Sequence, residues 1–215
     1  MRRCRKVAAG PALARVLPLV LAAMLLLIAG CGAVSDPAPH RTFLVQLDPA
    51  AVDAAGSRTP APPVYVAPVI VAAPFSSRSL VVRQSEVGFE EDPYAEFAAN
   101  PASMWTDAVV GWLEARQLFE RVLPFGTGAD APLTLETNVL EAVIDRRPGQ
   151  PATSRITIRF VLVRNETPGQ VLLDRTFTHA EPVKGSGAEG EVAALSLAAN
   201  HVLRDFEEAL VQIQK

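Results

Sequence analysis

The stretch SRITIRFVLVRN, residues 154–165, decides how the second half of this chain folds. Apolar and polar side chains alternate strictly along it. Ile156, Ile158, Phe160 and Leu162 point to one side, and arginine and threonine occupy the positions between the first three of them. A period of two residues is typical of a β-strand that has one buried face and one solvated face. We therefore predict a half-buried strand over these residues.

Two further strand-like stretches flank the first one. APLTLETNVLEAVIDRR (131–147) precedes it, and GQVLLDRTF (169–177) follows it. The alternation in the earlier stretch shifts near Val139 and Leu140, which predicts a β-bulge. The linking sequences RPGQPAT and NETPGQ carry the proline and glycine of hairpin turns. Together these stretches predict an antiparallel meander of three strands with one face open to water.

The C-terminal part of the chain has the period of a helix. Apolar residues recur there at intervals of three and four positions, which marks an amphipathic helix. We predict this helix over residues 188–214, a length of about 40 Å at 1.5 Å per residue, lying across the sheet. Its apolar stripe is expected to pack in the core, and a face for a partner protein is the alternative. The stripe consists of Leu195, Ala198, Val202, Phe206, Ala209 and Ile213.

The first half of the chain contains shorter elements. Pro68 interrupts one strand-like run and places that point at a sheet edge or a bulge. Asn100 and Pro101 fit the cap and the first position of a helix. The stretch SEVGFEEDPYAEFAANP (85–101) has no regular pattern and is predicted as a loop. The remaining predictions are strands at residues 42–47, 64–73, 79–84 and within 118–126, and a helix at residues 102–117.

These elements predict the fold class. Strands that alternate around one apolar face, followed by helices that can cover it, indicate two packed layers. We expect an α/β (α+β) sandwich, in which a mostly antiparallel sheet carries two main helices. The C-terminal helix is expected to be the long and amphipathic one.

The N-terminal stretch LPLVLAAMLLLIAGCGAVSDP predicts where the protein is located. Five basic residues and no acidic residue precede an apolar run of residues 16–28, which is shorter than the roughly 20 residues of a membrane span. These are the features of a secretory signal. The sequence Ile28-Ala29-Gly30-Cys31 resembles the lipobox of bacterial lipoproteins, in which the cysteine is acylated and the preceding peptide is removed. An ordinary signal peptide and an uncleaved anchor are the alternatives.

Lipidation of Cys31 would divide the chain into three parts. Residues 1–30 form the signal peptide, residues 31–41 a lipidated tether, and residues 42–215 a single periplasmic domain. Several acyl chains exceed the two signals that stable membrane attachment needs. In proteobacterial lipoproteins an aspartate after the cysteine favours retention in the inner membrane. Gly32 stands there, so the sequence permits the outer membrane.

The composition of the cleaved chain excludes several classes of function. Removal of residues 1–30 leaves 15 basic and 23 acidic residues, a net charge of −8. Nucleic acids and anionic lipid surfaces attract clustered lysine and arginine, so we expect no nucleic-acid partner. Cys4 leaves with the signal and Cys31 is acylated. No disulfide within the chain and no cysteine-based metal site is then expected.

No catalytic pattern is evident in the sequence. The three histidines are His40, His179 and His201, and no two of them are close along the chain. The acid run at residues 90–92 lacks the alternate spacing of a calcium loop and is expected to be solvated. Glu136 and Glu141 are expected on opposite faces of a strand unless a bulge lies between them. We therefore predict no enzyme activity, no catalytic residue, no metal and no cofactor.

The order of these elements resembles the ABC-type transport auxiliary lipoprotein family. A lipobox is followed by FLVQLDP, VYVAPVIV, SLVVRQ and YAEFAANPASMWTDAVVGWLEA. The signature region of that family runs from an arginine-ended strand through a tyrosine loop to a tryptophan, a proline and a helix. Phe97 stands where that family has tryptophan. The matching residues here are Arg83, Tyr94, Phe97, Pro101, Trp105 and Trp112.

This resemblance implies a function. Members of the family serve lipid-trafficking systems that pair an ABC ATPase and permease with a mammalian-cell-entry (MCE) domain protein. The protein would then be an outer-membrane lipoprotein partner of such a system, on the periplasmic face, and homo-oligomers are possible. The alternatives are a lipoprotein that activates a cell-wall (peptidoglycan) synthase and a lipid-handling hydrolase. Because aromatic side chains anchor interfaces, we expect Tyr94, Phe97 and Trp105 at the partner contact, although packing in the core is the other interpretation, above all for Trp105.

Overall fold

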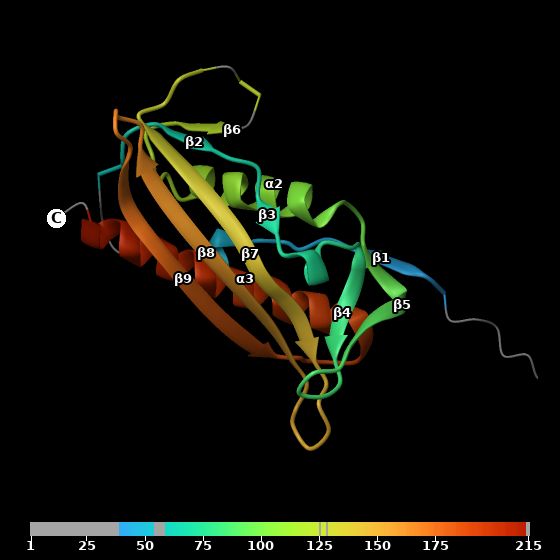
Figure 1. Cartoon of the computed structure of the whole chain (residues 1–215). Coiled ribbons are helices and arrows are strands. Elements are labelled where there is room, and N and C mark those ends of the chain that lie inside the picture. Colours follow the sequence, from blue (N-terminus) through green and yellow to red (C-terminus); the bar gives the residue numbers. More distant parts are fainter. Residues whose placement is uncertain (1–38, 54–58, 125, 128, 214–215) are drawn as a thin grey trace, which may run out of the picture. The chain divides into compact units, whose positions relative to one another are not determined.

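A computed structural model describes residues 39–53, 59–124, 126–127 and 129–213 of the chain (Figure 1). The following description concerns His40–Lys215, which form one compact unit. Its described part contains two α-helices and a sheet of nine strands. The prediction for the acylated Cys31 concerns a residue outside the described part of the chain.

The meander predicted from the sequence is present. β7 (Leu133–Asp145), β8 (Thr153–Arg164) and β9 (Gln170–Pro182) pair in antiparallel fashion along almost their whole length. The register between β7 and β8 shifts between Val139 and Glu141, which confirms the predicted bulge. Side chains of β8 alternate between buried and accessible, so one face of the meander packs in the core and the other is open.

Short strands line the other edge of β7 and pair with it in parallel fashion. β2 (Val64–Val66), β3 (Ile70–Val71) and β4 (Ser79–Arg83) follow one another along this edge. β2 also pairs with β6 (Val122–Pro124). Pro68 separates β2 from β3, as the sequence predicts. The sheet is therefore mixed, although its long pairings are antiparallel.

The prediction of a loop at residues 85–101 is wrong, because most of this stretch forms strand β5 (Phe89–Phe97). β5 pairs antiparallel with β4 and parallel with β1 (Arg41–Phe43). The register between β4 and β5 shifts after Val81↔Glu91, and four residues of β5 then face one residue of β4. This irregularity and the polar partners of β5 hide the strand period. β1 is also shorter than the predicted strand at residues 42–47.

The two helices cover the same face of the sheet (Figure 1). α2 (Pro101–Ala115) begins as predicted, because the Asn100 side chain accepts a hydrogen bond of 2.9 Å from the Ala102 amide. α3 (Gly187–Ile213) contacts β8, β9 and β7. Residues of both helices and of the inner sheet face belong to one apolar core.

The apolar stripe predicted on α3 packs in this core except at its end. Leu195, Ala198, Val202, Phe206 and Ala209 are buried. Phe206 stacks on Phe160 of β8 with 4.4 Å between the ring centroids. Ile213, the last residue of the stripe, is 44% exposed. Residues of α3 outside this stripe are buried as well, for example Leu203 and Leu210. Two 3-10 turns, η1 (Pro49–Ala51) and η2 (Ala73–Phe75), complete the described fold.

Candidate functional site

The three aromatic residues expected at a partner contact have different surroundings. Tyr94 lies on β5 and is 48% exposed, so a partner can reach it. Phe97 and Trp105 are buried in the core, at 5% and 1% exposure. A partner cannot contact these two side chains in the folded domain. The role of Tyr94 in partner binding stays a prediction.

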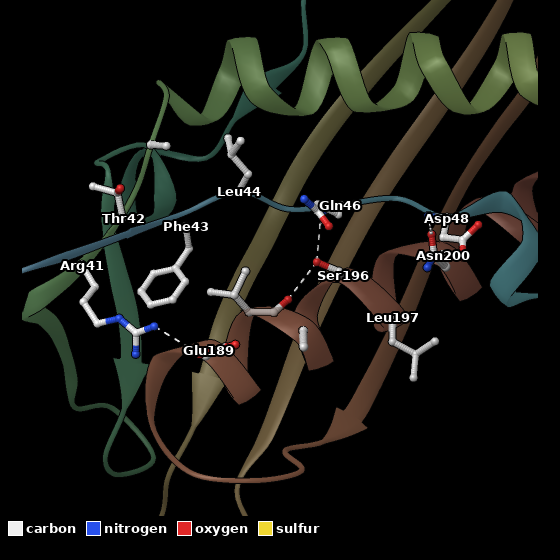
Figure 2. Close-up of a pocket in the computed structure, with 13 residues that line it drawn as sticks. Arg41, Thr42, Phe43, Leu44, Gln46, Asp48, Glu189, Ser196, Leu197 and Asn200 are labelled. Atoms are coloured by element: carbon white, nitrogen blue, oxygen red, sulfur yellow. Dashed lines mark hydrogen bonds and ion pairs between the residues drawn. The ribbon is translucent and has the colours of Figure 1, made fainter.

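The chain enters the domain beside the N-terminus of α3, and a polar site lies there (Figure 2). Arg41 of β1 pairs with Glu189 in the first turn of α3 at 3.1 Å. Both side chains are exposed, so the pair contributes little to stability. A groove of about 720 Å³ runs from this pair along the segment of residues 44–48 and α3.

Buried side chains of α3 hold the segment of residues 44–48 in place. The amide of Gln46 donates to Ser196 Oγ, and the amide of Asp48 donates to Asn200 Oδ1, both at 3.1 Å. Ser196 Oγ in turn donates to the Val192 carbonyl at 2.8 Å. Since Ser196 and Asn200 are four residues apart, they lie on one face of the helix. These two side chains provide the acceptors that a neighbouring strand would supply in a sheet.

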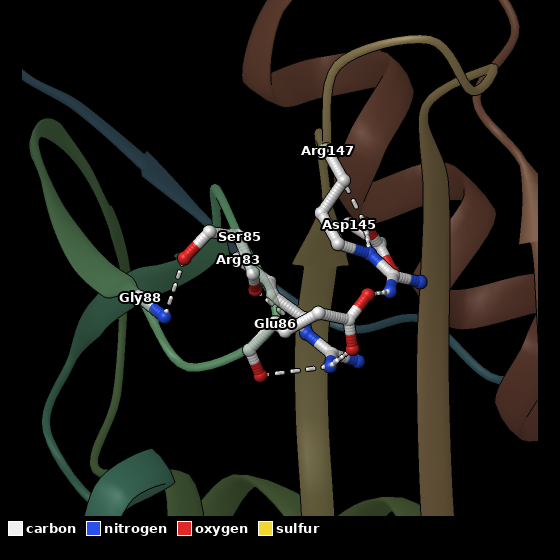
Figure 3. A network of polar contacts seen from close by, with 6 residues as sticks. All are labelled: Arg83, Ser85, Glu86, Gly88, Asp145 and Arg147. Carbon is white, nitrogen blue, oxygen red and sulfur yellow. Dashed lines mark hydrogen bonds and ion pairs between the residues drawn. The ribbon is translucent and has the colours of Figure 1, made fainter.

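A second polar cluster fixes the β4–β5 hairpin to the end of β7 (Figure 3). Arg147 donates to both carboxylate oxygens of Asp145, at 2.9 Å for Nη2 and 3.0 Å for Nε, and it also binds Glu86 in the hairpin turn. Glu86 accepts from Arg83 at 3.0 Å. The hydrogen bond from Arg147 lowers the pKa of Asp145 below its ordinary value, although the burial of the carboxyl opposes this.

The preceding arginine, Arg146, binds α3. It donates two hydrogen bonds of 2.7 Å to the carboxylate of Glu191, which is buried. Asp92 of β5 lies 3.8 Å from the same guanidinium group. The adjacent residues Arg146 and Arg147, which directly follow β7, therefore bind different elements: Arg146 binds α3, and Arg147 binds the β4–β5 hairpin.

A third charged contact is buried between the helices. Arg116, directly after α2, lies 3.3 Å from Glu207 of α3, which is 1% exposed. The same guanidinium group donates to the carbonyls of Val52 and Asp53 and lies over the ring of Trp112, 5.1 Å from its centroid. This arginine therefore connects α2, α3 and the segment that follows η1.

Two carboxylates of the acid run at residues 90–92 take part in local contacts. Glu91 accepts from the Ser77 hydroxyl at 2.8 Å, and Asp92 accepts from the Tyr94 amide at 2.9 Å. Glu136 and Glu141 are paired with Val161 and Thr157 of β8, which places both on the open face because the bulge lies between them. They stay several residues apart along β7.

Two of the three histidines come together although they are distant in sequence. The rings of His179 and His201 stack with 5.4 Å between their centroids. His179 Nε2 lies 2.7 Å from Asp205, and His201 Nε2 lies 3.5 Å from Glu181. No group of three or more residues able to hold a metal ion occurs in the part of the chain that the structure describes.

Sequence reasoning identified none of these polar contacts. Ser196, Asn200, Glu191 and Glu207 are polar residues on α3 that are nonetheless buried. Ser196, Asn200 and Glu207 do not belong to the predicted apolar stripe and lie on another side of the helix, about 100° or more from Leu195 and Val202, whereas Glu191 lies one turn before Leu195. Their burial shows that other elements also cover this side of the helix. The identity of their partners depends on the tertiary fold.

The comparison with protein families shows to which family the chain belongs. A family model described as the ABC-type transport auxiliary lipoprotein component matches residues 45–206. This chain belongs to that family. Members are lipoproteins, so membership implies that the domain is anchored to a membrane. Within the described residues, neither helix is long and apolar enough to cross a bilayer.

Solved structures show the same fold. The crystal structure of XCC0632 from Xanthomonas campestris, of family model DUF330, is 17% identical, with a TM-score of 0.64 over 84% of this chain and 93% of that one. A second crystal structure, of an uncharacterized protein, is 14% identical, with a TM-score of 0.60 over 82% of this chain and 99% of the other. No curated protein sequence matches this chain.

Proposed function

We propose that this protein is an outer-membrane lipoprotein of an MCE/ABC-type lipid transport system that links the inner and outer membranes. The observation that carries the proposal is the family match over residues 45–206, and the lipobox-like sequence that ends at Cys31 supports it. The partners are an MCE-domain protein in the periplasm and the ABC permease and ATPase behind it. A second copy of the chain is a further candidate partner.

The protein is proposed to act by binding partners rather than by catalysis. Members of its family are described as auxiliary components of transport systems, which supports this role. The charged residues described above also support it, because they bind one another and hold elements together. Arg116 with Glu207 and Arg146 with Glu191 join the helices to the rest of the domain. Such internal pairing suits a rigid module that presents a surface.

Genetics tests the proposal directly. The gene for this chain and the gene for the MCE-domain protein are deleted singly and together, and the sensitivity of the cells to detergent is measured. We expect equal sensitivity in all three strains, because both products serve one pathway. Additive sensitivity in the double deletion would contradict the proposal. Reduced incorporation of a cell-wall label in the single deletion, with detergent resistance unchanged, would favour the synthase-activator alternative.

Complementation provides the control for location. The intact gene should restore resistance, whereas a Cys31→Ala variant should not, since it lacks the acylated residue. Gradient separation of the two membranes should place the intact protein in the outer-membrane fraction. Recovery in the inner-membrane fraction would refute the proposed location.

A further inference from the structure

We propose that an extended segment of a protein partner pairs with the outer edge of β9 and lengthens the sheet by one strand. This inference rests on the proposed function, which supplies the partner. β9 has 13 residues and lies at one margin of the sheet (Figure 1). Its pairing with β8 uses one edge, and no other strand in the described part of the chain pairs with it. The strands at the other margins, β1 and β6, have only three residues each.

A hydrogen bond just after β9 shows which of its backbone groups point away from β8. The amide of Val183 donates to the carbonyl of Ala152 at 2.9 Å, so these two residues form a hydrogen-bonded pair. Such pairs alternate with non-hydrogen-bonded pairs along an antiparallel ladder, and the register is continuous from here back to Leu173. Every second residue before Val183 therefore bonds to β8, and the residues between have their amide and carbonyl groups on the outer edge. In the middle of the strand these outward residues are Asp174, Thr176, Thr178 and Ala180.

The two ends of the outer edge are closed to a further strand. Leu172 is the extra residue of a β-bulge, because the register with β8 shifts there. Pro182 has no amide hydrogen to donate. Bulges and prolines are common means by which proteins prevent the pairing of an edge strand. The stretch between them, residues 174–180, is the part of the edge on which another strand can pair.

The side chains in this stretch leave the edge accessible. Asp174 accepts two hydrogen bonds from Arg159 of β8, at 2.7 and 2.6 Å, and the hydroxyls of Thr178 and Thr157 lie 2.9 Å apart. These side chains therefore lie over the open face of the sheet, toward β8, and not beside the outer edge. All four outward residues are exposed. A partner strand can reach their backbone groups.

An extended peptide backbone is the occupant that matches this edge. The outward residues offer four amide hydrogens and four carbonyl oxygens, repeated at every second residue. Two residues of a strand span about 6.6–6.8 Å, and another strand presents its own groups at the same interval. A segment of about seven residues thus forms up to about eight hydrogen bonds with residues 174–180. Recognition by strand addition draws its affinity from such main-chain bonds.

The side chains next to the edge favour a segment in which apolar and polar residues alternate. Directly opposite residues of two paired strands lie on the same face of the sheet. On the α3 face, Phe177 is only partly buried, and its ring centroid lies 6.2 Å from that of Phe160. An apolar residue opposite Phe177 would cover it. On the open face, the exposed Thr176 favours a polar residue.

The charge of the protein favours a different protein over a second copy as the source of this segment. After removal of residues 1–30 the chain has a net charge of −8. Like net charges oppose self-association, whereas complementary potentials favour the encounter of two different proteins. The proposal therefore commits to a segment of the periplasmic partner, and pairing of two β9 edges would overturn it.

Amide exchange measured by NMR tests the contact residue by residue. The mature acylated protein is held in detergent micelles, alone or with the purified periplasmic part of the MCE-domain protein. In the free protein, the amides of Thr176 and Thr178 should exchange fast, whereas those of Arg175 and Phe177, which bond to β8, should be protected. We expect the partner to slow exchange at Thr176 and Thr178 at least tenfold. Unchanged exchange there in the complex would overturn the inference. Protection that grows with the concentration of the free protein would show pairing of two copies and would overturn it as well.

Affinity measurements separate this inference from the proposed function. Thr176→Pro removes one outward amide hydrogen and leaves the ladder with β8 intact, whereas Thr176→Ala changes the same side chain and keeps the amide. We expect Thr176→Pro to weaken binding of the periplasmic part of the MCE-domain protein at least tenfold, and Thr176→Ala to change the Kd less than twofold. Proline is tolerated at outward positions of edge strands, so both variants should melt close to the parent.

The outcomes distinguish the two proposals. Unchanged binding by a folded Thr176→Pro variant would overturn strand addition at β9 and leave the proposed function standing. If Thr176→Pro melts far below the parent, the exchange pattern of the parent complex decides alone. No binding by the parent protein would overturn both proposals.

Discussion

Phe206 tests the packing of α3 on the sheet. Its side chain is fully buried, and its ring stacks on Phe160 with an angle of 23° between the planes. Phe206→Ala removes this ring from the centre of the core and leaves a cavity, because backbone on both sides relaxes only in part. Substitutions of this kind cost about 3–5 kcal/mol.

The magnitude can be checked against a matched site on the same helix. Ile213 is 44% exposed, so Ile213→Ala forfeits only about half of the roughly 2 kcal/mol that burial of such a side chain contributes. We expect a loss of about 1 kcal/mol there. The two variants differ in burial while they share the helix and the change to alanine.

Urea denaturation of a form that starts at Gly32, and therefore carries no anchor, gives the loss of unfolding free energy for both variants. In a thermal melt of the same form, the melting temperature of Phe206→Ala should fall by about 6–20 °C, since 1 kcal/mol corresponds to about 2–4 °C in a domain of this size. A loss below about 1 kcal/mol, or one equal to that of Ile213→Ala, would refute the reasoning. The ring would then not be part of the core.

Three further substitutions test other parts of the account. Cys31→Ala should abolish labelling of the protein by a fatty-acid analogue, and undiminished label would refute lipidation at this residue. Asp145→Asn should lower the urea midpoint at neutral pH, and the difference from the parent should vanish as the pH falls. The reason is that Arg147 lowers the pKa of Asp145 in the folded state, so its stabilisation is complete above the unfolded value near 4 and is lost as the pH falls through the folded value. A difference that persists at low pH would contradict this sign. Arg116→Met should cost about 3–5 kcal/mol in urea denaturation, because it leaves the buried Glu207 carboxylate without this partner. Arg159→Met, which removes an exposed pair with Asp174, should have little effect and serves as its control.

Local patterns predicted the elements that depend on neighbouring residues. The alternation at residues 154–165 identifies β8 because one face of that strand packs in the core and the other is open. Asn100 caps α2 through a bond to an amide two residues away, so a short motif is enough. The bulge at Leu140 was visible because it shifts the apolar pattern within one strand.

Strand β5 could not be predicted in the same way. Its residues are mostly polar or exposed, and their partners come from other parts of the chain. Asp92 lies near Arg146, and Glu91 binds Ser77. The pairing with β1 joins residues more than fifty positions apart, as in Arg41↔Ala95. Nothing in the local period of the sequence records such contacts.

The polar site beside α3 shows the same limit. Gln46 and Ser196 are 150 residues apart, and their hydrogen bond exists only because the segment after β1 lies along the helix. The period of the sequence predicts the helix and its apolar stripe, but not the second layer that buries Ser196 and Asn200. The same reason explains why Phe97 and Trp105 were expected at an interface. Aromatic density alone does not distinguish a surface from a core.

Co-purification of the acylated protein from detergent-solubilised envelopes tests the central claim most directly. The bound proteins are identified by mass spectrometry and compared with those of a Cys31→Ala strain. The account predicts that an MCE-domain protein and its ABC permease and ATPase are enriched with the intact protein. Enrichment of peptidoglycan synthases without any transport component would contradict it.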